Sequence, residues 1–259
     1  MNKYYLGIDL GSVTSKAVIV NDDQEVIASS IMPTESNYKT VAEKCLAEVC
    51  NQAGIRQEQL TFSIGTGYGR KKIPFVDKDI TEISCHAKGI AQTFPGTETI
   101  IDIGGQDTKV IKLTSEAKVA NFMMNDKCAA GTGRFLEVMA YSLKQTLPEI
   151  NMLANESGCE IEISSICTVF AESEVISLKA DGNDIADIAK AIFKSISSKI
   201  IAMTEKVSPA VNKLVFTGGV AKNKFLVQYL QDHWKTEIKI PGEPQLTGAL
   251  GAALHAQGN

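Results

Sequence analysis

Apolar and polar residues follow two recurring patterns along the chain. Short apolar runs bounded by turn residues predict strands at residues 4–10, 16–20, 25–32 and 61–65, and a second set at 99–103, 108–113, 118–123 and 213–216. Apolar positions at helical spacing predict helices at residues 38–53, 81–93, 133–143, 168–179, 185–207, 223–232 and 246–255. The mixture predicts an α/β fold.

The two sets of strands open in the same way. Asp9 ends one strand in the order Asp-Leu-Gly-Ser, and Asp102 ends another in the order Asp-Ile-Gly-Gly, 93 residues later. A second β-rich strand follows each. The spacing predicts an internal repeat of one supersecondary unit, with the chain divided near Pro95-Gly96.

Composition and charge restrict the classes of partner. The 259 residues carry 26 basic and 30 acidic side chains, a net charge of −4, which excludes a bulk polybasic surface for nucleic acid or anionic membrane. No apolar run approaches the roughly 18–20 residues that span a bilayer, and the N-terminus lacks the apolar region of a signal peptide. We therefore expect a cytoplasmic protein with no nucleic-acid or membrane partner.

Three glycine turns follow strands, at Gly11, at Gly104-Gly105 and at Gly218-Gly219. Any one of them alone is most simply a turn. Together they suit a nucleotide, because glycine lets backbone amides approach phosphate oxygens. A Mg-nucleotide between the two repeats would be held by the strand-borne Asp9 and Asp102 and by the hairpin donors Ser12, Thr14 and Lys16. The P-loop pattern G-x-x-x-x-G-K-[ST] is absent from the sequence.

Six cysteines lack any C-x-x-C spacing, which argues against a zinc ribbon or a ferredoxin-type run. Cys128 and Cys167 each precede a predicted helix, where the helix N-terminus favours a thiolate or an anionic ligand. A [4Fe–4S] cluster takes four cysteines, so two chains would supply a complete set for a cluster on the two-fold axis of a homodimer. Two unpaired helix-start cysteines are the alternative.

The other four cysteines favour structural roles or none. Cys45 and Cys50 lie on an apolar-patterned helix and are expected in the core. Cys85 precedes His86, but adjacent residues on a helix point apart, which argues against a catalytic dyad. Cys159 follows a polar stretch, and the sequence assigns it no role.

The glycine motifs resemble those of a large ATPase superfamily. Asp9-Leu-Gly-Ser, Asp102-Ile-Gly-Gly-Gln and Phe216-Thr-Gly-Gly-Val look like the phosphate-1, phosphate-2 and adenosine motifs of the acetate kinase/sugar kinase/Hsp70/actin superfamily. The resemblance implies two ribonuclease-H-like domains with ATP between them, domain I at residues 1–95 plus 246–259 and domain II at 96–245. Segments 82–91 and 246–254 would be small-residue helices that cross at a hinge, although two ordinary packing helices also fit.

The segments around Cys128 and Cys167 resemble those of one particular group within this superfamily. Asp126-Lys-Cys-Ala-Ala-Gly-Thr-Gly-Arg and Cys167-Thr-Val-Phe-Ala-Glu-Ser-Glu look like the signatures of (R)-2-hydroxyacyl-CoA dehydratase activators, in the BadF/BadG/BcrA/BcrD ATPase family, and the similarity covers nearly the whole chain. It implies that Cys128 and Cys167 of two identical subunits hold one [4Fe–4S] cluster. ATP hydrolysis would drive an electron from reduced ferredoxin or flavodoxin to a 2-hydroxyacyl-CoA dehydratase or related double-cluster reductase.

The same resemblance implies a role for each site residue. Asp9 and Asp102 would position Mg²⁺ and water, and Gly218 and Gly219 would pack beside the adenosine. Gln106 or Asp107 would orient the attacking water, and the sequence does not choose between them. The phosphates would be held by Ser12, Thr14, Lys16, Gly104, Gly105 and Gln106.

Two other functions use the same nucleotide motifs. A sugar or carboxylate kinase of this fold would need an acceptor site with an aspartate base, for which Asp107 is a candidate. That interpretation leaves both cysteine motifs without a role. A non-catalytic nucleotide sensor would bind ATP tightly and hydrolyse it slowly or not at all.

Overall fold

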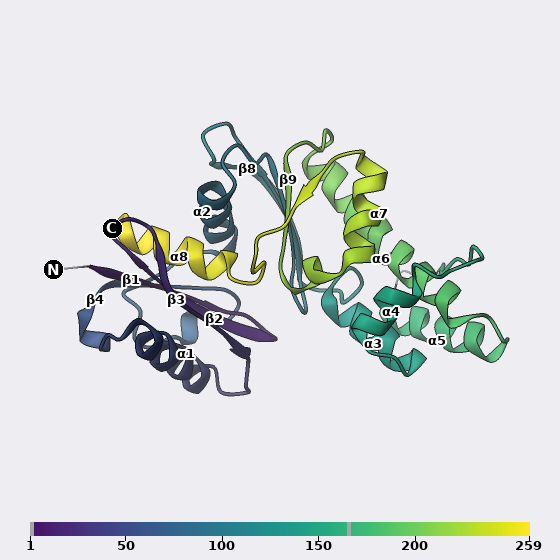
Figure 1. The fold of residues 1–259 in the computed structure, drawn as a ribbon, viewed down its shortest axis with the longest axis horizontal. Coiled ribbons are helices and arrows are strands. Elements are labelled where there is room, and N and C mark those ends of the chain that lie inside the picture. The colour runs from purple at the N-terminus through teal and green to yellow at the C-terminus, as the bar shows by residue number, and fades with distance from the viewer. Residues whose placement is uncertain (1–2, 165–166) are drawn as a thin grey trace.

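Two five-stranded sheets form the framework of the protein (Figure 1). The structure is a computed structural model and describes residues 3–164 and 167–259. The first sheet has the order β3-β2-β1-β4-β5. Its antiparallel part comprises β1 (Tyr4–Leu10), β2 (Thr14–Asn21) and β3 (Val26–Pro33), while β4 (Leu60–Thr66) and β5 (Lys78–Asp79) extend it in parallel.

The second sheet repeats this arrangement. Antiparallel β6 (Thr99–Ile103), β7 (Thr108–Leu113) and β8 (Val119–Asn125) are extended in parallel by β9 (Leu214–Thr217) and β10 (Ile238–Lys239). Read from β8, its order is β8-β7-β6-β9-β10, the same connectivity as the first sheet. The predicted internal repeat is confirmed, and the domain limits near residues 95 and 246 stay a prediction.

Helices pack beside each sheet and between the two. In the first unit α1 (Tyr38–Ala53) packs on the sheet, and α2 (Glu82–Thr93) and α8 (Thr247–Gln257) lie between the sheets (Figure 1). The second unit carries α3 (Gly133–Leu143), α4 (Leu147–Leu153), α5 (Thr168–Ala180), α6 (Ile185–Val207) and α7 (Lys224–Trp234). Three 3₁₀ turns span Gln57–Gln59, Arg70–Lys72 and Gly219–Lys222. Within the described residues, no helix has the length and apolar character to cross a membrane.

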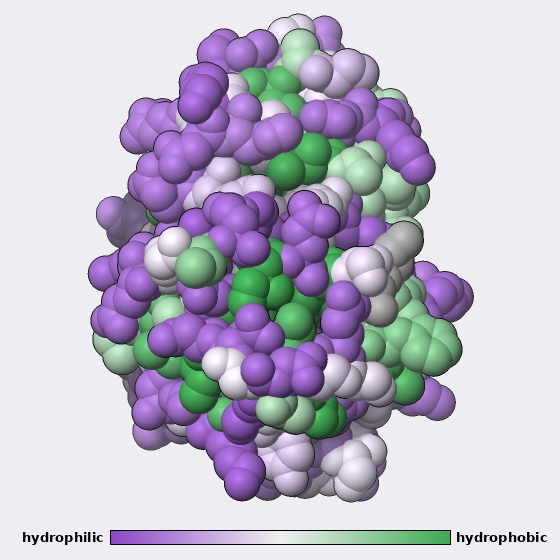
Figure 2. Space-filling model, turned by 90° about the vertical axis from the view of Figure 1, so that its right-hand side faces the viewer, coloured by the Kyte–Doolittle hydropathy of each residue, from purple (hydrophilic) through white to green (hydrophobic). Residues whose placement is uncertain are grey.

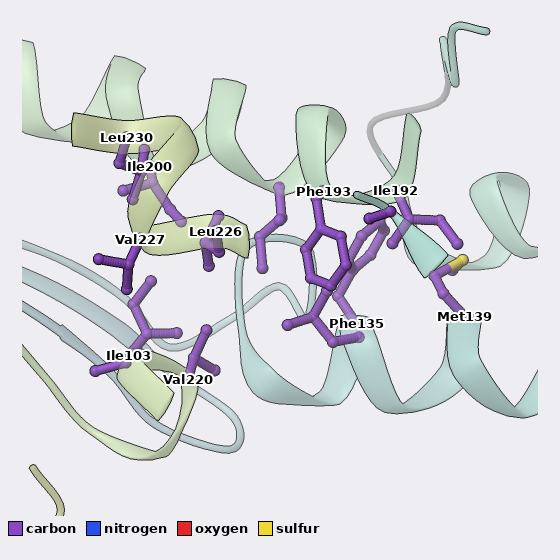
Figure 3. Close-up of a cluster of buried hydrophobic side chains, with 14 of the residues drawn as sticks. Ile103, Phe135, Met139, Ile192, Phe193, Ile200, Val220, Leu226, Val227 and Leu230 are labelled. Atoms are coloured by element: carbon purple, nitrogen blue, oxygen red, sulfur yellow. The ribbon is translucent and has the colours of Figure 1, made fainter. Parts of the chain in front are cut away.

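The largest buried cluster joins the second sheet to its helices (Figure 3). Phe135 of α3 and Phe193 of α6 point toward each other, and Ile103 of β6 and Leu226 of α7 lie along the same cluster. Each of these side chains is 1% exposed or less. Burial of one such side chain contributes about 1.5–3 kcal/mol, so this core fixes α3 and α6 relative to the strand that ends at Asp102 and Ile103.

Helices α2 and α8 cross at backbone contact because glycine occupies the crossing. A Cβ added to Gly251 would overlap the carbonyl oxygen of Cys85, and a Cβ on Gly89 would overlap that of Thr247. Gly7 of β1 lies equally close to the backbone of α8. The expected close packing of the two small-residue helices is confirmed, and their action as a hinge stays a prediction.

Helix α4 was not predicted from the sequence. Helix α4 is closed by a reciprocal capping box, in which the Thr146 side chain accepts a hydrogen bond from the backbone amide of Glu149 and the Glu149 carboxylate accepts from the amide of Thr146. Pro148 lies in its first turn. The pattern Thr-x-x-Glu with proline is a helix-start signal. The signal is therefore present in the sequence, but the helix is too short to show a clear helical period.

Candidate functional site

A cavity of about 580 Å³ opens between the loops of the two repeats. Its floor is formed by the ends of β1 and β6, and its walls by the hairpin after β1, the first turns of α2 and α3, and the turn after β9. Ten of the residues expected at a nucleotide site line it together, namely Asp9, Ser12, Thr14, Lys16, Asp102, Gly104, Gly105, Gly218, Gly219 and also Gly11.

The two candidates for orienting water are placed differently. Asp107 lines the cavity, and its carboxylate is held by Lys109 Nζ at 2.8 Å. Gln106 is exposed at the turn between β6 and β7 and does not line the cavity. Gly104 N–H donates to the Asp107 carbonyl across this turn. The structure therefore brings Asp107, but not Gln106, to the other site residues.

Each repeat places a lysine opposite its strand-ending aspartate. Lys16 pairs with Asp9 in the β1–β2 ladder and approaches it to 3.5 Å. Lys109 pairs with Asp102 in the β6–β7 ladder at 3.1 Å. Sequence analysis missed Lys109, although the repeat could have found it, because the offset of 93 positions that relates the aspartates also relates the lysines.

Lys109 is the centre of the charged cluster in the cavity. Its side chain is 4% exposed and contacts Asp102, Asp107 and, at 3.7 Å, Glu82. Burial alone would lower the pKa of Lys109, but these three carboxylates raise it above its usual range. Burial likewise opposes ionisation of Asp102, yet His86, Lys109 and the Thr217 hydroxyl hold the Asp102 pKa well below its usual value. Both groups are therefore charged at neutral pH.

Glu82 is a second residue that sequence analysis missed. It occupies the first turn of α2, whose N-terminus is capped by the Thr81 side chain, and it lines the cavity. Burial raises the Glu82 pKa to about 7, and the attraction of Lys109 only partly opposes this shift. A carboxyl group that titrates near neutral pH beside a cavity is able to accept or release a proton there.

His86 joins the two crossing helices to the charged cluster. Its Nδ1 lies 2.9 Å from the Thr247 hydroxyl on α8, and its Nε2 lies 3.5 Å from Asp102 Oδ2. The neighbouring Cys85 is fully buried, and burial raises its thiol pKa to about 12. A thiol with so high a pKa is protonated at neutral pH, which further disfavours Cys85 as a nucleophile.

Part of the cavity lining is apolar. Leu136 of α3, Leu147 and Met152 of α4, and Val220 after β9 line it beside Gly218 and Gly219. An apolar wall next to a polar phosphate-binding region suits the flat base of a nucleotide. Because α4 supplies much of this wall, the helix that escaped sequence analysis completes the cavity.

Cys128 and Cys167 are exposed and free of disulfides. Cys128 lies in the segment between β8 and α3, and Cys167 is the N-cap of α5. The buried positions of Cys45 and Cys50 confirm their assignment to the core. Cys159 is exposed, and its backbone amide donates to Asp187 Oδ1 at 2.9 Å.

Large hydrophobic side chains are exposed in the first turn of α5 and on α3. Val169 and Phe170 follow Cys167 and are 66% and 67% exposed, while Tyr141 of α3 is 82% exposed. Figure 2 shows this end of the molecule, where apolar residues (green) lie between polar ones. Exposed apolar area of this kind is typical of a surface that contacts another protein.

Comparison with known proteins identifies the family. The sequence model described as the BadF/BadG/BcrA/BcrD ATPase family matches residues 6–256. The chain belongs to this family. Among curated members, the 2-hydroxyisocaproyl-CoA dehydratase activator of Clostridioides difficile is 43% identical over 253 residues, which cover 98% of this chain and 94% of the relative.

Solved structures agree with the family assignment. The C. difficile activator with bound ADPNP has a TM-score of 0.91 and 42% identity, over 98% of this chain and 94% of that one. Component A of (R)-2-hydroxyglutaryl-CoA dehydratase from Acidaminococcus fermentans has a TM-score of 0.93 and 42% sequence identity, over 99% of this chain and 98% of that one. A ROK-family glucokinase of Streptomyces griseus has 12% sequence identity and a TM-score of 0.62, over 99% of this chain and 100% of that one. This match shows the actin/Hsp70-like fold alone.

Proposed function

We propose that the protein is an ATP-dependent reductive activator. It hydrolyses ATP and passes a low-potential electron to a partner iron–sulfur enzyme of the 2-hydroxyacyl-CoA dehydratase or benzoyl-CoA reductase type. The observation that carries the proposal is the pair of exposed free cysteines, Cys128 and Cys167, on the helical unit that also lines the nucleotide cavity. A small-molecule kinase of the same fold gives these cysteines no role.

The cavity residues support the ATPase part of the proposal. The donors of the first hairpin and the backbone amide of Gly105 hold the phosphates, and Gly104, which has no side chain, lets the turn approach them. Gly218 and Gly219 pack beside the adenosine. Asp9 and Asp102 position Mg²⁺ and water. Asp107 orients the attacking water rather than Gln106, because only Asp107 lines the cavity. Glu82, whose pKa is about 7, is placed to accept the proton.

The cysteine positions fit a cluster shared by two chains. Among the described residues, no group of three or more metal-binding side chains is assembled within one chain. Cys128 and Cys167 provide two thiolates per chain, so a second copy completes the four that a [4Fe–4S] cluster requires. Such a cluster supplies one-electron transfer when bound. The exposed apolar side chains of Val169, Phe170 and Tyr141 are then covered, at least in part, by the second copy.

The remaining parts of the proposal concern the partners. The donor is reduced ferredoxin or flavodoxin, the acceptor is the dehydratase or reductase, and the protein acts in the cytoplasm. ATP bound between the two repeats biases the angle between them about the crossing of α2 and α8. The domains that move are residues 1–95 with 246–259, and residues 96–245.

Iron content tests the proposal directly. Protein prepared under strict exclusion of oxygen should contain about four iron and four sulfide per two chains, and should have the mass of a dimer. Cys128→Ala and Cys167→Ala should each lose the iron, whereas Cys159→Ala, which removes another exposed thiol, should keep it. Absence of iron after anaerobic reconstitution, or a normal cluster in either of the first two variants, would refute the cluster assignment.

A further inference from the structure

The segment that carries Cys128 is tied to the phosphate-binding turn after β6. Helix α3 has no side-chain cap, although the first amides of a helix need acceptors. Two of them are satisfied by the turn itself, because Gly133 N–H donates to the Gly104 carbonyl at 2.9 Å and Arg134 N–H donates to the Gly105 carbonyl at 2.8 Å. The turn and the start of α3 are therefore joined backbone to backbone.

No space separates these two pieces of backbone. A Cβ added to Gly133 would lie 3.0 Å from the Gly104 carbonyl oxygen and 3.3 Å from Gly105 Cα. A displacement of the turn by a few tenths of an ångström must therefore move the start of α3 or break its hydrogen bonds, because close-packed groups transmit displacement. The buried Phe135 and Leu136 then anchor the helix that begins there.

The Cys128 segment itself is held by β7, which continues from the same turn, and by the last residue of β8. Thr108, the first residue of β7, pairs with Asn125, the last residue of β8. The Thr108 hydroxyl donates to the Gly131 carbonyl, and Asn125 Nδ2 donates to the carbonyls of Cys128, at 2.8 Å, and Ala130, at 3.1 Å. Residues 126–132, which we name the cysteine loop, are thus bonded to β7 at Gly131 and to the last residue of β8 at Cys128 and Ala130, and they lead directly into the α3 residues that are bonded to the turn.

We infer that the cysteine loop and the phosphate-binding turn move as one body. Asn125 is the positioning residue through which the bound nucleotide determines the position of Cys128. The inference rests on the proposed function for the ligand role of Cys128. Phosphate bound at the Gly105 amide shifts the turn, and the five hydrogen bonds carry the shift to the Cys128 backbone. The link needs no contact between nucleotide and cluster.

Thiol alkylation in the full-length, cluster-free protein tests this link. Iodoacetamide is added without nucleotide, with Mg-ADP and with Mg-ADPNP, and the labelled peptides are quantified by mass spectrometry. We expect Mg-ADPNP to change the alkylation rate of Cys128 by about fivefold relative to Mg-ADP, a typical coupling between two sites. Cys159, which is exposed but outside the cysteine loop, should react at one rate throughout.

Asn125→Ala should keep the nucleotide affinity and lose the nucleotide dependence of Cys128 alkylation, because it removes both side-chain bonds to the loop. Asn125→Asp keeps the shape of the side chain but removes the amide donor, so it should have the same effect. It replaces the alanine variant in the test if that variant folds poorly. Asn121→Ala is the matched control on β8, since the exposed Asn121 side chain bonds only the next amide in the structure. It should respond like the natural chain.

Two results would overturn the inference. One is a Cys128 rate that Mg-ADPNP leaves unchanged in protein shown to bind Mg-ADPNP. The other is an unaltered nucleotide response in folded Asn125→Ala and Asn125→Asp. Failure of the proposed function looks different, because it leaves protein that binds no nucleotide or takes up no iron, and the link to a cluster then falls with it.

Discussion

Replacing Glu82 by glutamine tests the electrostatics of the cavity. The Glu82 side chain is 15% exposed, and burial raises its pKa from the ordinary 4.5 to about 7, although Lys109 lies 3.7 Å away. The folded protein therefore binds this proton more tightly than the unfolded chain. Stability contributed by the proton is fully present below about pH 4.5 and is lost as the pH rises through about 7.

The size of the effect follows from the two pKa values. A difference between 4.5 and about 7 corresponds to about 3 kcal/mol of unfolding free energy. Glutamine has the shape of the protonated glutamic acid and carries no charge at any pH. We therefore expect Glu82→Gln to differ from the natural chain by less than about 1 kcal/mol near pH 5 and to be more stable by about 3 kcal/mol near pH 8.

Urea unfolding of nucleotide-free protein, followed by circular dichroism at both pH values, measures this difference. Glu98→Gln is the control for the loss of one negative charge, because Glu98 is 38% exposed and pairs with Lys112 and Lys213 at the surface. Its effect should stay within about 0.5 kcal/mol at both pH values. The reasoning is refuted if Glu82→Gln and the natural chain lose the same free energy between the two pH values.

Two further substitutions test the packing around the cavity. Lys109→Met should lower the unfolding free energy by about 3–5 kcal/mol, because it leaves buried carboxylates without their cation. Lys112 lies on the same strand and is 28% exposed, so the control Lys112→Met should cost less than about 1 kcal/mol. Equal losses in thermal unfolding would contradict the central place of Lys109. Gly251→Ala should cost about 3 kcal/mol or more, because its Cβ would overlap the Cys85 carbonyl, whereas Gly258→Ala has room. A neutral Gly251→Ala would contradict the tight crossing of α2 and α8.

The sequence was most informative where local pattern and chemistry coincide. The strands of both sheets were predicted apart from the two-residue edge strands β5 and β10, which are too short to show a period of two. The cavity residues on the two hairpins were found because aspartate and glycine follow strands at matching positions. Glu82 and His86 were missed, because each becomes a site residue only through contacts distant in sequence, such as Glu82 with Lys109 and Thr247 with His86. Lys109 was missed although the internal repeat relates it to Lys16.

The two repeats share the cavity but differ in what connects their strands. Between β3 and β4 the chain forms one long helix, α1, and a short 3₁₀ turn, whereas between β8 and β9 it forms α3, α4, α5 and α6. All residues of the proposed cluster site lie in this longer connection, and so do the apolar wall of α4 and the hydrogen bonds from α3 to residues 104–105. This one connection thus bears both cysteines and also lines the nucleotide cavity. The inferred coupling between the two sites therefore runs from the turn after β6 to the start of α3 and to the cysteine loop that Asn125 holds, and the displacement does not have to cross either sheet.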